Sequence, residues 1–413
     1  MSAFELKNGT LHVENVSLAD IAARFGTPAY VYSRQDIERA YTAYDNAFTK
    51  PHTIHYAVKA NSNLAVLNIL ARLGAGFDIV SVGELERVLA AGGHAERTVF
   101  SGVGKQAYEI KRALEVGIGC FNVESEPELD LIIQVAQSMG KPAPISVRVN
   151  PDVDAKSHPY ISTGLHENKF GVNFEQALPM YQKAHASEHC TVIGIDCHIG
   201  SQISTIAPYV ESVEKILRFV DSLEQHGIQL TVFDIGGGIG IRYRDEATIN
   251  LTEYAQTIES LLGERKLHIG LEPGRSIVGN AGVMLTKVLF KKSNPAKNFV
   301  VVDGAMNDLI RPALYQAWMN ITPVTPKDEP LEKVDVVGPV CESSDFLGLD
   351  RELALDTNDL LAVHGAGAYG ACMSSNYNTR PRLPEILVDN ESVWLIKPRE
   401  ELHAQWADET LIP

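Results

Sequence analysis

The sequence predicts an α/β protein that consists of a (β/α)8 TIM-like barrel and a mainly β C-terminal domain. Between about residues 53 and 275, short apolar segments rich in β-branched residues alternate with segments of helical periodicity. Eight strand-then-helix units of this length match the size of a barrel with parallel strands. A doubly wound sheet is the alternative. After Arg275, strand-like segments continue without regular helices between them, which indicates a separate β domain.

The expected strands follow from the positions of the apolar segments. The eight barrel strands are expected at Ile54–Val58, Phe77–Val80, Thr98–Phe100, Cys120–Val123, Ile145–Val149, Val192–His198, Val232–Ile235 and His268–Leu271. The later strands are expected at Val283–Phe290, Asn298–Val302, Val334–Val337, Leu360–Val363, Ile386–Val388 and Ser392–Ile396. Phe4–Lys7 and Thr10–Val13 can join the same later sheet. The predicted domains are residues 28–280 for the barrel and residues 1–27 with 281–413 for the β-sheet-rich domain.

Two of the expected helices begin with recognisable caps. Ser81 with Glu84 and Ser125 with Glu128 fit the capping box, in which a hydroxyl and a carboxylate each accept a hydrogen bond from an unpaired amide. Gly92-Gly93 and Gly140 are the expected helix ends.

Composition limits the possible partners and the compartment. The 413 residues carry 52 acidic against 36 Lys and Arg side chains, a formal charge of −16, which disfavours nucleic acid as a partner. The N-terminus has no signal-peptide pattern, and no stretch is long and apolar enough to span a membrane. The five cysteines are odd in number and lack a C-x-x-C motif, so neither disulfides nor a metal site are expected. A cytoplasmic protein fits best.

Polar residues follow the expected barrel strands at the ends where barrel active sites lie. Lys59 emerges from an apolar strand, and desolvation there would favour the neutral amine that Schiff-base chemistry needs. A lone lysine is usually a solvated surface charge, so the neighbours decide. The other residues expected at this end of the barrel are Asp78, Arg148, Asn150, His198, Ser201, Gly236-Gly237-Gly238, Glu272 and Gly274-Arg275.

These residues suit pyridoxal phosphate. The glycine turns after the seventh and eighth strands occupy the place where many barrels bind phosphate, and Ser201 could add a hydroxyl. Glu272 could keep the pyridine nitrogen protonated, which the cofactor needs to withdraw electrons, although a salt bridge with Arg275 is the alternative. His198 could lie flat on the cofactor ring, although a lone histidine at a strand end is more often structural.

A second glycine motif suggests a different cofactor. Residues 365–370 fit G-x-G-x-x-G after a strand, and Asp389 lies about 20 residues further on, as a dinucleotide site requires. The prolines and asparagines between Ser374 and Pro384 would interrupt the long helix of such a site. We therefore interpret the motif as a glycine-rich loop.

Several motifs together resemble the fold type III PLP-dependent decarboxylases and, among them, the diaminopimelate decarboxylase family. The resemblance extends over nearly the whole chain. The motifs are H-Y-A-V-K-A-N (55–61), G-F-D-I-V-S-x-G-E (76–84), H-I-G-S-Q (198–202), D-I-G-G-G (234–238), E-P-G-R (272–275), R-P-x-L-Y (311–315), G-P-V-C-E-S-S-D (338–345) and G-A-Y-G (367–370). Residues 169–171 also match the family, without an assignable role.

The resemblance implies a role for each matching residue. Lys59 would bind the cofactor covalently, His198 would stack on its ring, and Glu272 would pair with its nitrogen. The residues implied at the phosphate are Ser201, Gly238, Gly274 and Arg275, and Tyr369 would also reach the cofactor. The residues implied at the distal end of the substrate are Arg275, Arg311, Tyr315, Tyr369 and Glu342. Cys341 would return a proton to the substrate carbon.

The resemblance also implies decarboxylation of meso-2,6-diaminopimelate to L-lysine and CO2, the last step of lysine biosynthesis. Cys341 and Glu342 would enter the site from the other subunit of a homodimer, so the β-sheet-rich domain would complete the active site. The alternatives are a sister decarboxylase that acts on ornithine, arginine or carboxynorspermidine, a non-catalytic regulatory homologue, and a nicotinamide enzyme that uses residues 365–370.

Overall fold

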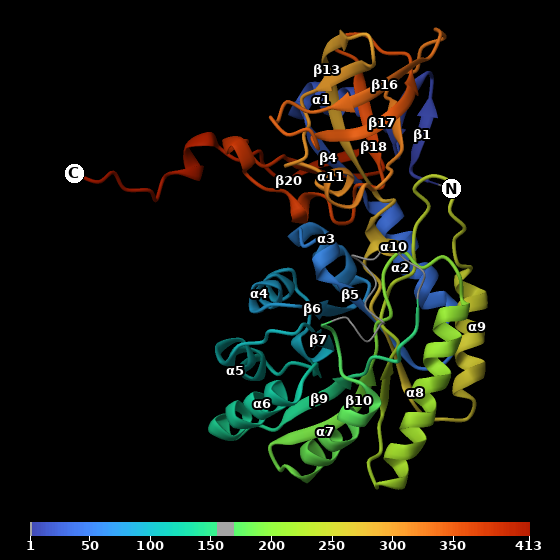
Figure 1. Ribbon diagram of the computed structural model, residues 1–413, viewed down its shortest axis with the longest axis vertical. Coiled ribbons are helices and arrows are strands. Elements are labelled where there is room, and N and C mark those ends of the chain that lie inside the picture. Colours follow the sequence, from blue (N-terminus) through green and yellow to red (C-terminus); the bar gives the residue numbers. More distant parts are fainter. Residues whose placement is uncertain (1, 155–168) are drawn as a thin grey trace. The chain divides into compact units, whose positions relative to one another are not determined.

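The computed structural model describes residues 2–154 and 169–413 (Figure 1). The chain forms two compact units. One comprises residues 40–242 and 246–276, and the other comprises residues 1–39, 243–245 and 277–413. The second unit includes residues 28–39, 243–245 and 277–280, which the sequence predicts to be part of the barrel.

The first unit contains a closed barrel of parallel strands, which confirms the predicted (β/α)8 architecture. Its strands are β5 (His52–Ala57), β6 (Gly76–Ile79), β7 (Thr98–Phe100), β8 (Cys120–Val123), β9 (Ala143–Arg148), β10 (Cys190–Asp196), β11 (Val232–Asp234) and β12 (His268–Leu271). The last strand pairs with the first, so the sheet has no free edge. Five of the predicted barrel strands extend one or two residues too far at their C-terminal ends. Val58 lies with Lys59 on the short 3-10 helix η1 (Val58–Ala60), and His198 lies in the loop after β10.

Helices lie around the outside of these strands in Figure 1. They are α3 (Leu64–Arg72), α4 (Val82–Ala90), α5 (Ala107–Val116), α6 (Glu126–Met139), α7 (Phe174–Ala186), α8 (Ala207–Gln225) and α9 (Leu251–Leu262). Helix α2 (Arg34–Ala47) precedes β5, and the short α10 (Arg275–Val278) follows β12. The strands bury their side chains in the barrel and under this helical layer, which explains why they appear as apolar runs in the sequence.

The predicted helix caps form with one difference. Ser81 and Ser125 each accept a hydrogen bond from the amide three residues later, as the capping box predicts. The carboxylates of Glu84 and Glu128, however, accept from Val80 and Glu124, the residues that precede each cap. Gly140 ends α6 in the left-handed conformation, with φ of 62°.

The second unit is built around the long strand β13 (Gly282–Ser293), and its mainly β character is as predicted. The sheet order is β17-β16-β14-β13-β4-β19-β20. Strand β18 also pairs with β13, and β15 pairs with β18. The other bounds are β4 (Ala29–Ser33), β14 (Asn298–Val302), β15 (Ile321–Pro323), β16 (Glu332–Val337), β17 (Phe346–Leu353), β18 (Leu360–His364), β19 (Glu385–Asp389) and β20 (Ser392–Lys397). Helices α1 (Leu18–Phe25) and α11 (Arg311–Tyr315) complete it.

The N-terminal strands differ from the prediction. Strands β1 (Phe4–Lys7), β2 (Thr10–Val13) and β3 (Val16–Ser17) form a separate three-stranded sheet and do not join the larger one. Leu18 and Ile21 of α1 pack with Val13 of β2 and Val283 of β13 in one buried cluster. The burial of this apolar face attaches the small sheet to the unit without strand pairing.

The glycine-rich segment after β18 is a tightly packed loop, as predicted. A side chain at Gly367 would overlap the carbonyl of Val278, and one at Gly370 would lie 2.5 Å from the carbonyl of Ala366. Only a three-residue 3-10 helix follows, over Ala371–Met373. A dinucleotide turn requires a long helix at this point, so residues 365–370 lack the structure of such a site.

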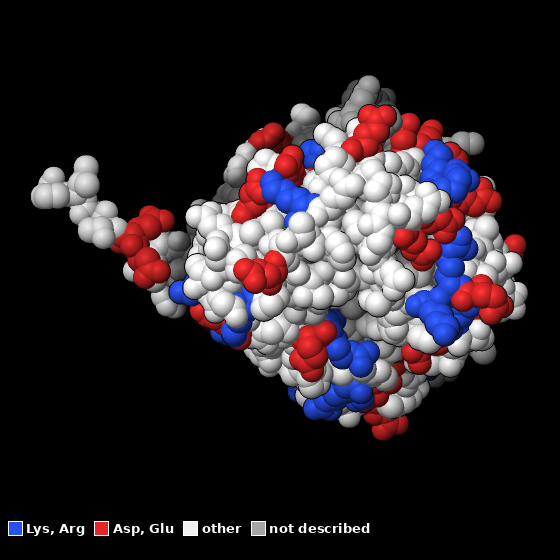
Figure 2. Space-filling model, turned by 90° about the horizontal axis from the view of Figure 1, so that it is seen from below, with Lys and Arg blue, Asp and Glu red and all other residues white. Residues whose placement is uncertain are grey.

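Two surface properties can be described. Within residues 2–154 and 169–413, no helix is long and apolar enough to cross a bilayer. On the face in Figure 2, basic and acidic side chains are interspersed around a largely uncharged area.

Candidate active site

Lys59 is held at the C-terminal end of the barrel by an ion pair with Asp78. Its Nζ atom lies 2.8 Å from Oδ2 of Asp78, which is fully buried on β6. Parallel pairing of Ala57 with Asp78 brings the two strand ends together. The Lys59 side chain remains 39% exposed, so its amine is accessible to a ligand.

His198 is half-buried next to the glycine turn after β11. Its Nδ1 atom accepts a hydrogen bond of 3.2 Å from the amide of Gly237, which places the ring proton on Nε2. Burial lowers the pKa of His198 well below its ordinary value, and the charges of Arg148 and Lys59 lower it further. The imidazole is therefore neutral, as a ring that stacks on an aromatic cofactor should be.

The glycines after β11 are required by close packing. A Cβ at Gly236 would overlap the carbonyl of Cys197, and a Cβ at Gly237 would overlap that of Glu272. A Cβ at Gly238, where φ is 103°, would overlap the carbonyl of Gly200. The amides of Gly236 and Gly237 donate hydrogen bonds to Asp234 and to His198.

Arg275 supplies a positive charge beside these turns. Its Nη2 atom donates a hydrogen bond of 3.1 Å to Oγ of Ser201, and Arg275 itself is buried. Gly274 packs against Ala57 and Ala60, next to Lys59 in the chain. The barrel thus brings Lys59, Ser201 and Arg275 to the same strand ends. A guanidinium and a hydroxyl next to glycine turns are suitable ligands for a phosphate.

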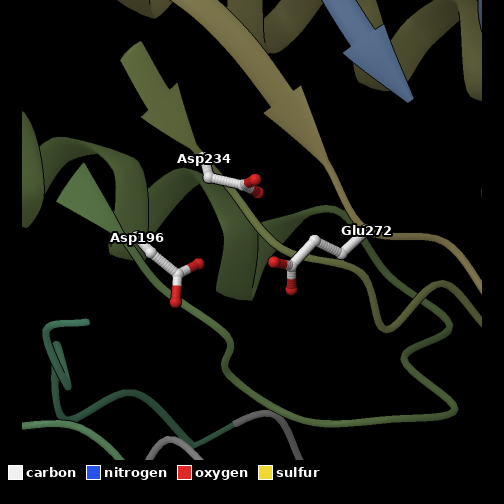
Figure 3. Close-up of side chains that lie close together, drawn as sticks. All are labelled: Asp196, Asp234 and Glu272. Carbon is white, nitrogen blue, oxygen red and sulfur yellow. The ribbon is translucent and has the colours of Figure 1, made fainter. Parts of the chain in front are cut away.

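Glu272 belongs to a cluster of three buried carboxylates, together with Asp196 and Asp234 (Figure 3). Its Oε1 atom accepts a hydrogen bond of 3.3 Å from Asn122. Burial raises the pKa of Glu272 well above its ordinary value, and Asp78, Asp234 and Asp196 raise it further. The sequence allows a salt bridge between Glu272 and Arg275, but no ion pair joins these two described residues. Glu272 faces other acidic side chains instead.

The other predicted site residues belong to the second unit. Arg311 is buried at the start of α11, where its Nη1 atom donates a 2.8 Å hydrogen bond to the hydroxyl of Tyr243. Tyr315 ends the same helix. Cys341 and Glu342 are exposed, and Glu342 accepts a hydrogen bond of 2.6 Å from Tyr377. Tyr369 lies in the glycine-rich loop with φ of 55°.

Sequence reasoning missed three polar residues of these groups: Asp196, Asp234 and Tyr243. The two aspartates end β10 and β11, and their position at strand ends is a signal that could have identified them. Tyr243 lies about 70 residues before Arg311, and nothing in the sequence indicates that they are in contact.

Comparisons with known proteins agree with this geometry. Residues 34–279 match the pyridoxal binding domain of pyridoxal-dependent decarboxylases. The diaminopimelate decarboxylase of Vibrio cholerae is 56% identical, with 98% of each chain covered, and that of Pseudomonas aeruginosa is 55% identical, with 100% of each chain covered. This chain belongs to the diaminopimelate decarboxylase family.

The solved structures extend the comparison to the fold of this decarboxylase. The Helicobacter pylori diaminopimelate decarboxylase complexed with L-lysine is 46% identical, with a TM-score of 0.92 over 95% of this chain and 98% of its own. The diaminopimelate decarboxylase of M. jannaschii in complex with L-lysine is 38% identical, with a TM-score of 0.95 over 100% of this chain and 99% of its own. The predicted fold and enzyme class are therefore confirmed.

The cofactor of this decarboxylase is pyridoxal phosphate, and the barrel residues fit it chemically. Lys59 offers a partly exposed amine, and Arg275 with Ser201 offers a cation and a hydroxyl for the phosphate. Glu272 offers a carboxylate for a protonated ring nitrogen. His198, neutral and adjacent to the glycine turn, offers a flat ring. Each part of the cofactor thus has a suitable partner in one unit of the chain.

Proposed function

We propose that this enzyme removes one carboxylate from meso-2,6-diaminopimelate to give L-lysine and CO2, the last step of lysine biosynthesis. The observation that carries this conclusion is the similarity over the full length to relatives named for that activity, 56% identical over 98% of the chain. The barrel residues support it, because Lys59, Glu272 and Arg275 provide the groups that a pyridoxal phosphate decarboxylase requires.

The barrel residues bind and orient the cofactor. Lys59 would hold it covalently through its amine until the amino group of the substrate takes its place, and Asp78 would position that amine. When bound, the cofactor supplies a conjugated ring that accepts the electron pair left by the departing carboxylate. His198 supports the face of the ring, and Glu272 holds the proton on its nitrogen. The phosphate and its surroundings are assigned to Ser201, Gly238, Gly274, Arg275 and Tyr369.

The substrate residues recognise an amino-acid group at the distal end. Diaminopimelate carries both a carboxylate and an ammonium there, so the site needs a cation and an anion. Arg311 supports the first role, because its buried guanidinium is oriented by the hydroxyl and the ring of Tyr243. Glu342 takes the ammonium. Arg275, Tyr315 and Tyr369 complete the proposed set.

Cys341 is the proposed proton donor. Loss of CO2 leaves an electron pair on the substrate carbon, and one proton must be added there to form lysine. The thiol of Cys341 is exposed and can donate that proton and then recover one from solvent. The direct donor is either this thiol or a water molecule next to it.

We place the enzyme in the cytoplasm as a homodimer with shared active sites, to which the partner contributes its Cys341 and Glu342. All five cysteines of the chain are free thiols, which suits a reducing compartment. Mixing the inactive variants Lys59→Ala and Cys341→Ala tests the dimer. After random reassociation, half of the dimers contain one copy of each variant. If the sites are shared, each mixed dimer has one intact site out of two, so about a quarter of wild-type activity is restored. No recovery after verified exchange would contradict shared sites.

Product analysis tests the activity itself. Wild-type protein with pyridoxal phosphate is incubated separately with meso-diaminopimelate, ornithine and arginine, and CO2 and the amine products are quantified. We expect L-lysine from diaminopimelate alone. Release of CO2 from ornithine but not from diaminopimelate would identify a sister decarboxylase. A protein without a borohydride-sensitive chromophore would instead be a non-catalytic homologue.

A further inference from the structure

The carboxylate cluster is assembled from the ends of three neighbouring barrel strands. One carboxylate oxygen from each of Asp196, Asp234 and Glu272 lies within 4.8 Å of the others. Their side chains converge in Figure 3 from β10, β11 and the end of β12. The residues are only 1%, 4% and 7% exposed, so water screens their charges poorly.

The local backbone fixes Asp234 in this cluster. Its Oδ1 atom accepts a 2.8 Å hydrogen bond from the amide of Gly236. Gly270, which pairs with Asp234 across β11 and β12, has no side chain to occupy the same space. A Cβ at Gly270 would overlap the carboxylate. The backbone therefore both holds this acid and leaves room for it.

The surrounding cations do not balance the cluster. The charged groups that face it are Lys59, Asp78, Glu124 and Arg148. Lys59 pairs with Asp78 at 2.8 Å, and Arg148 pairs with Glu124 at 3.2 Å, whereas Arg148 lies 3.9 Å from Asp196. These two pairs are neutral, so no further cation is left to neutralise the three carboxyl groups fully. Burial raises the pKa of all three, and their mutual repulsion raises the pKa of Asp234 and Glu272 further.

A separate observation indicates that water reaches this cluster. Asp234 and Asn122 line a cavity of about 430 Å³ that also reaches His52 and His268 at the other end of the barrel. Ser146 lines the same cavity, and its Oγ atom is buried without a hydrogen-bond partner among the described residues. A cavity of this size with buried polar atoms in its wall has room for bound water. Such water can exchange protons with Asp234.

We propose that Asp196 and Asp234 are positioning residues that act through Glu272 to keep the ring nitrogen of pyridoxal phosphate protonated. This inference rests on the proposed function, which assigns Glu272 to that nitrogen. A carboxyl group of the cluster would give its proton to the ring nitrogen and become a carboxylate, so the charges would balance. That negative charge would favour the positive charge on the ring nitrogen, and Glu272 would accept the hydrogen bond of the N–H group.

A cofactor analogue isolates the contribution of the nitrogen. The full-length protein is freed of cofactor and titrated with pyridoxal phosphate and with its 1-deaza analogue, in which a C–H group replaces the ring nitrogen. Wild type is compared with the near-isosteric variants Asp234→Asn and Asp196→Asn. We expect each substitution to reduce the preference for pyridoxal phosphate about tenfold, the equivalent of one pKa unit, and to leave the affinity for the analogue unchanged.

Glu109→Gln is the matched control, because Glu109 is a buried barrel carboxylate that binds backbone amides away from the cluster. It should retain the wild-type preference. An equal loss of affinity for both cofactors in the two aspartate variants would show a structural role and overturn the proposal, as would an unchanged preference. If Asp234→Asn does not fold, Asp196→Asn decides. Failure of wild type to bind pyridoxal phosphate would instead refute the proposed function.

Discussion

The Nζ atom of Lys59 lies 2.8 Å from a carboxylate oxygen of Asp78, a residue with no exposed surface. The two residues are 19 positions apart in the sequence, and parallel pairing of β5 and β6 brings them together. Asp78 thus fixes the position of the amine that is proposed to bind the cofactor.

Replacing Asp78 with asparagine should weaken cofactor binding without preventing it. The amide retains the size of the carboxylate but loses its charge, so Lys59 is held less firmly. Because the lysine side chain is 39% exposed, solvent screening should limit the loss to about tenfold in affinity. Titration of the cofactor-free protein with pyridoxal phosphate measures this. An unchanged affinity would contradict a role of Asp78 at the cofactor.

Replacing Lys59 with alanine should abolish both the borohydride-sensitive chromophore and turnover. The covalent bond to the cofactor requires an amine, and no substitute for it remains in alanine. Absorbance spectra before and after borohydride, together with CO2 release, provide the measurement. Retention of either signal would refute the assignment of Lys59.

Replacing Tyr243 with phenylalanine should raise the KM for diaminopimelate about tenfold with little change in kcat. The substitution removes the 2.8 Å hydrogen bond from Arg311 but keeps the aromatic ring, whose centre lies 4.8 Å from the guanidinium. A hydrogen bond to a charged group contributes about 1.5–3 kcal/mol, so a loosely held guanidinium should bind the carboxylate less well. Steady-state kinetics test this split. A fall in kcat at unchanged KM would exclude Arg311 as a substrate ligand that Tyr243 orients.

Replacing Lys105 with methionine should destabilise the barrel by about 3 kcal/mol. Lys105 and Glu128 form a buried ion pair at 2.7 Å, with side chains only 1% and 6% exposed. Methionine leaves the Glu128 carboxylate buried without its cation. Urea unfolding measures the change, and the double variant Lys105→Met with Glu128→Gln should recover part of it. A loss below about 1 kcal/mol would show that the pair is as weak as a surface ion pair.

His55 should make the stability depend on pH in the acidic range. Burial lowers the pKa of His55 from 6.5 to about 4, so the unfolded chain binds a proton that the folded protein excludes. Stability should therefore fall as pH decreases from about 6.5 to about 4, by about 3 kcal/mol in total. Unfolding free energies measured across this pH range should change less steeply with pH for His55→Gln than for wild type. Identical slopes would contradict the assignment.

The sequence by itself determined the barrel, the β domain and the strand ends at which the proposed cofactor residues lie. Barrel strands are buried on both sides, so they appear as apolar runs, and their ends carry the functional residues in a regular order. The order of these ends predicts Lys59, His198, Glu272 and Arg275 as cofactor residues, and the family motifs predict Arg311, Tyr315, Cys341, Glu342 and Tyr369 as further site residues.

Only the tertiary structure decided which side chains meet. The convergence of Asp196 and Asp234 on Glu272 depends on strand register and on the space left at Gly270. The contact between Tyr243 and Arg311 joins residues that are 68 positions apart. The pairing of β4 with β13 and the separate sheet of β1 to β3 also join distant segments. Local patterns record which residues are buried, but contacts between distant segments arise from the packing of the whole chain.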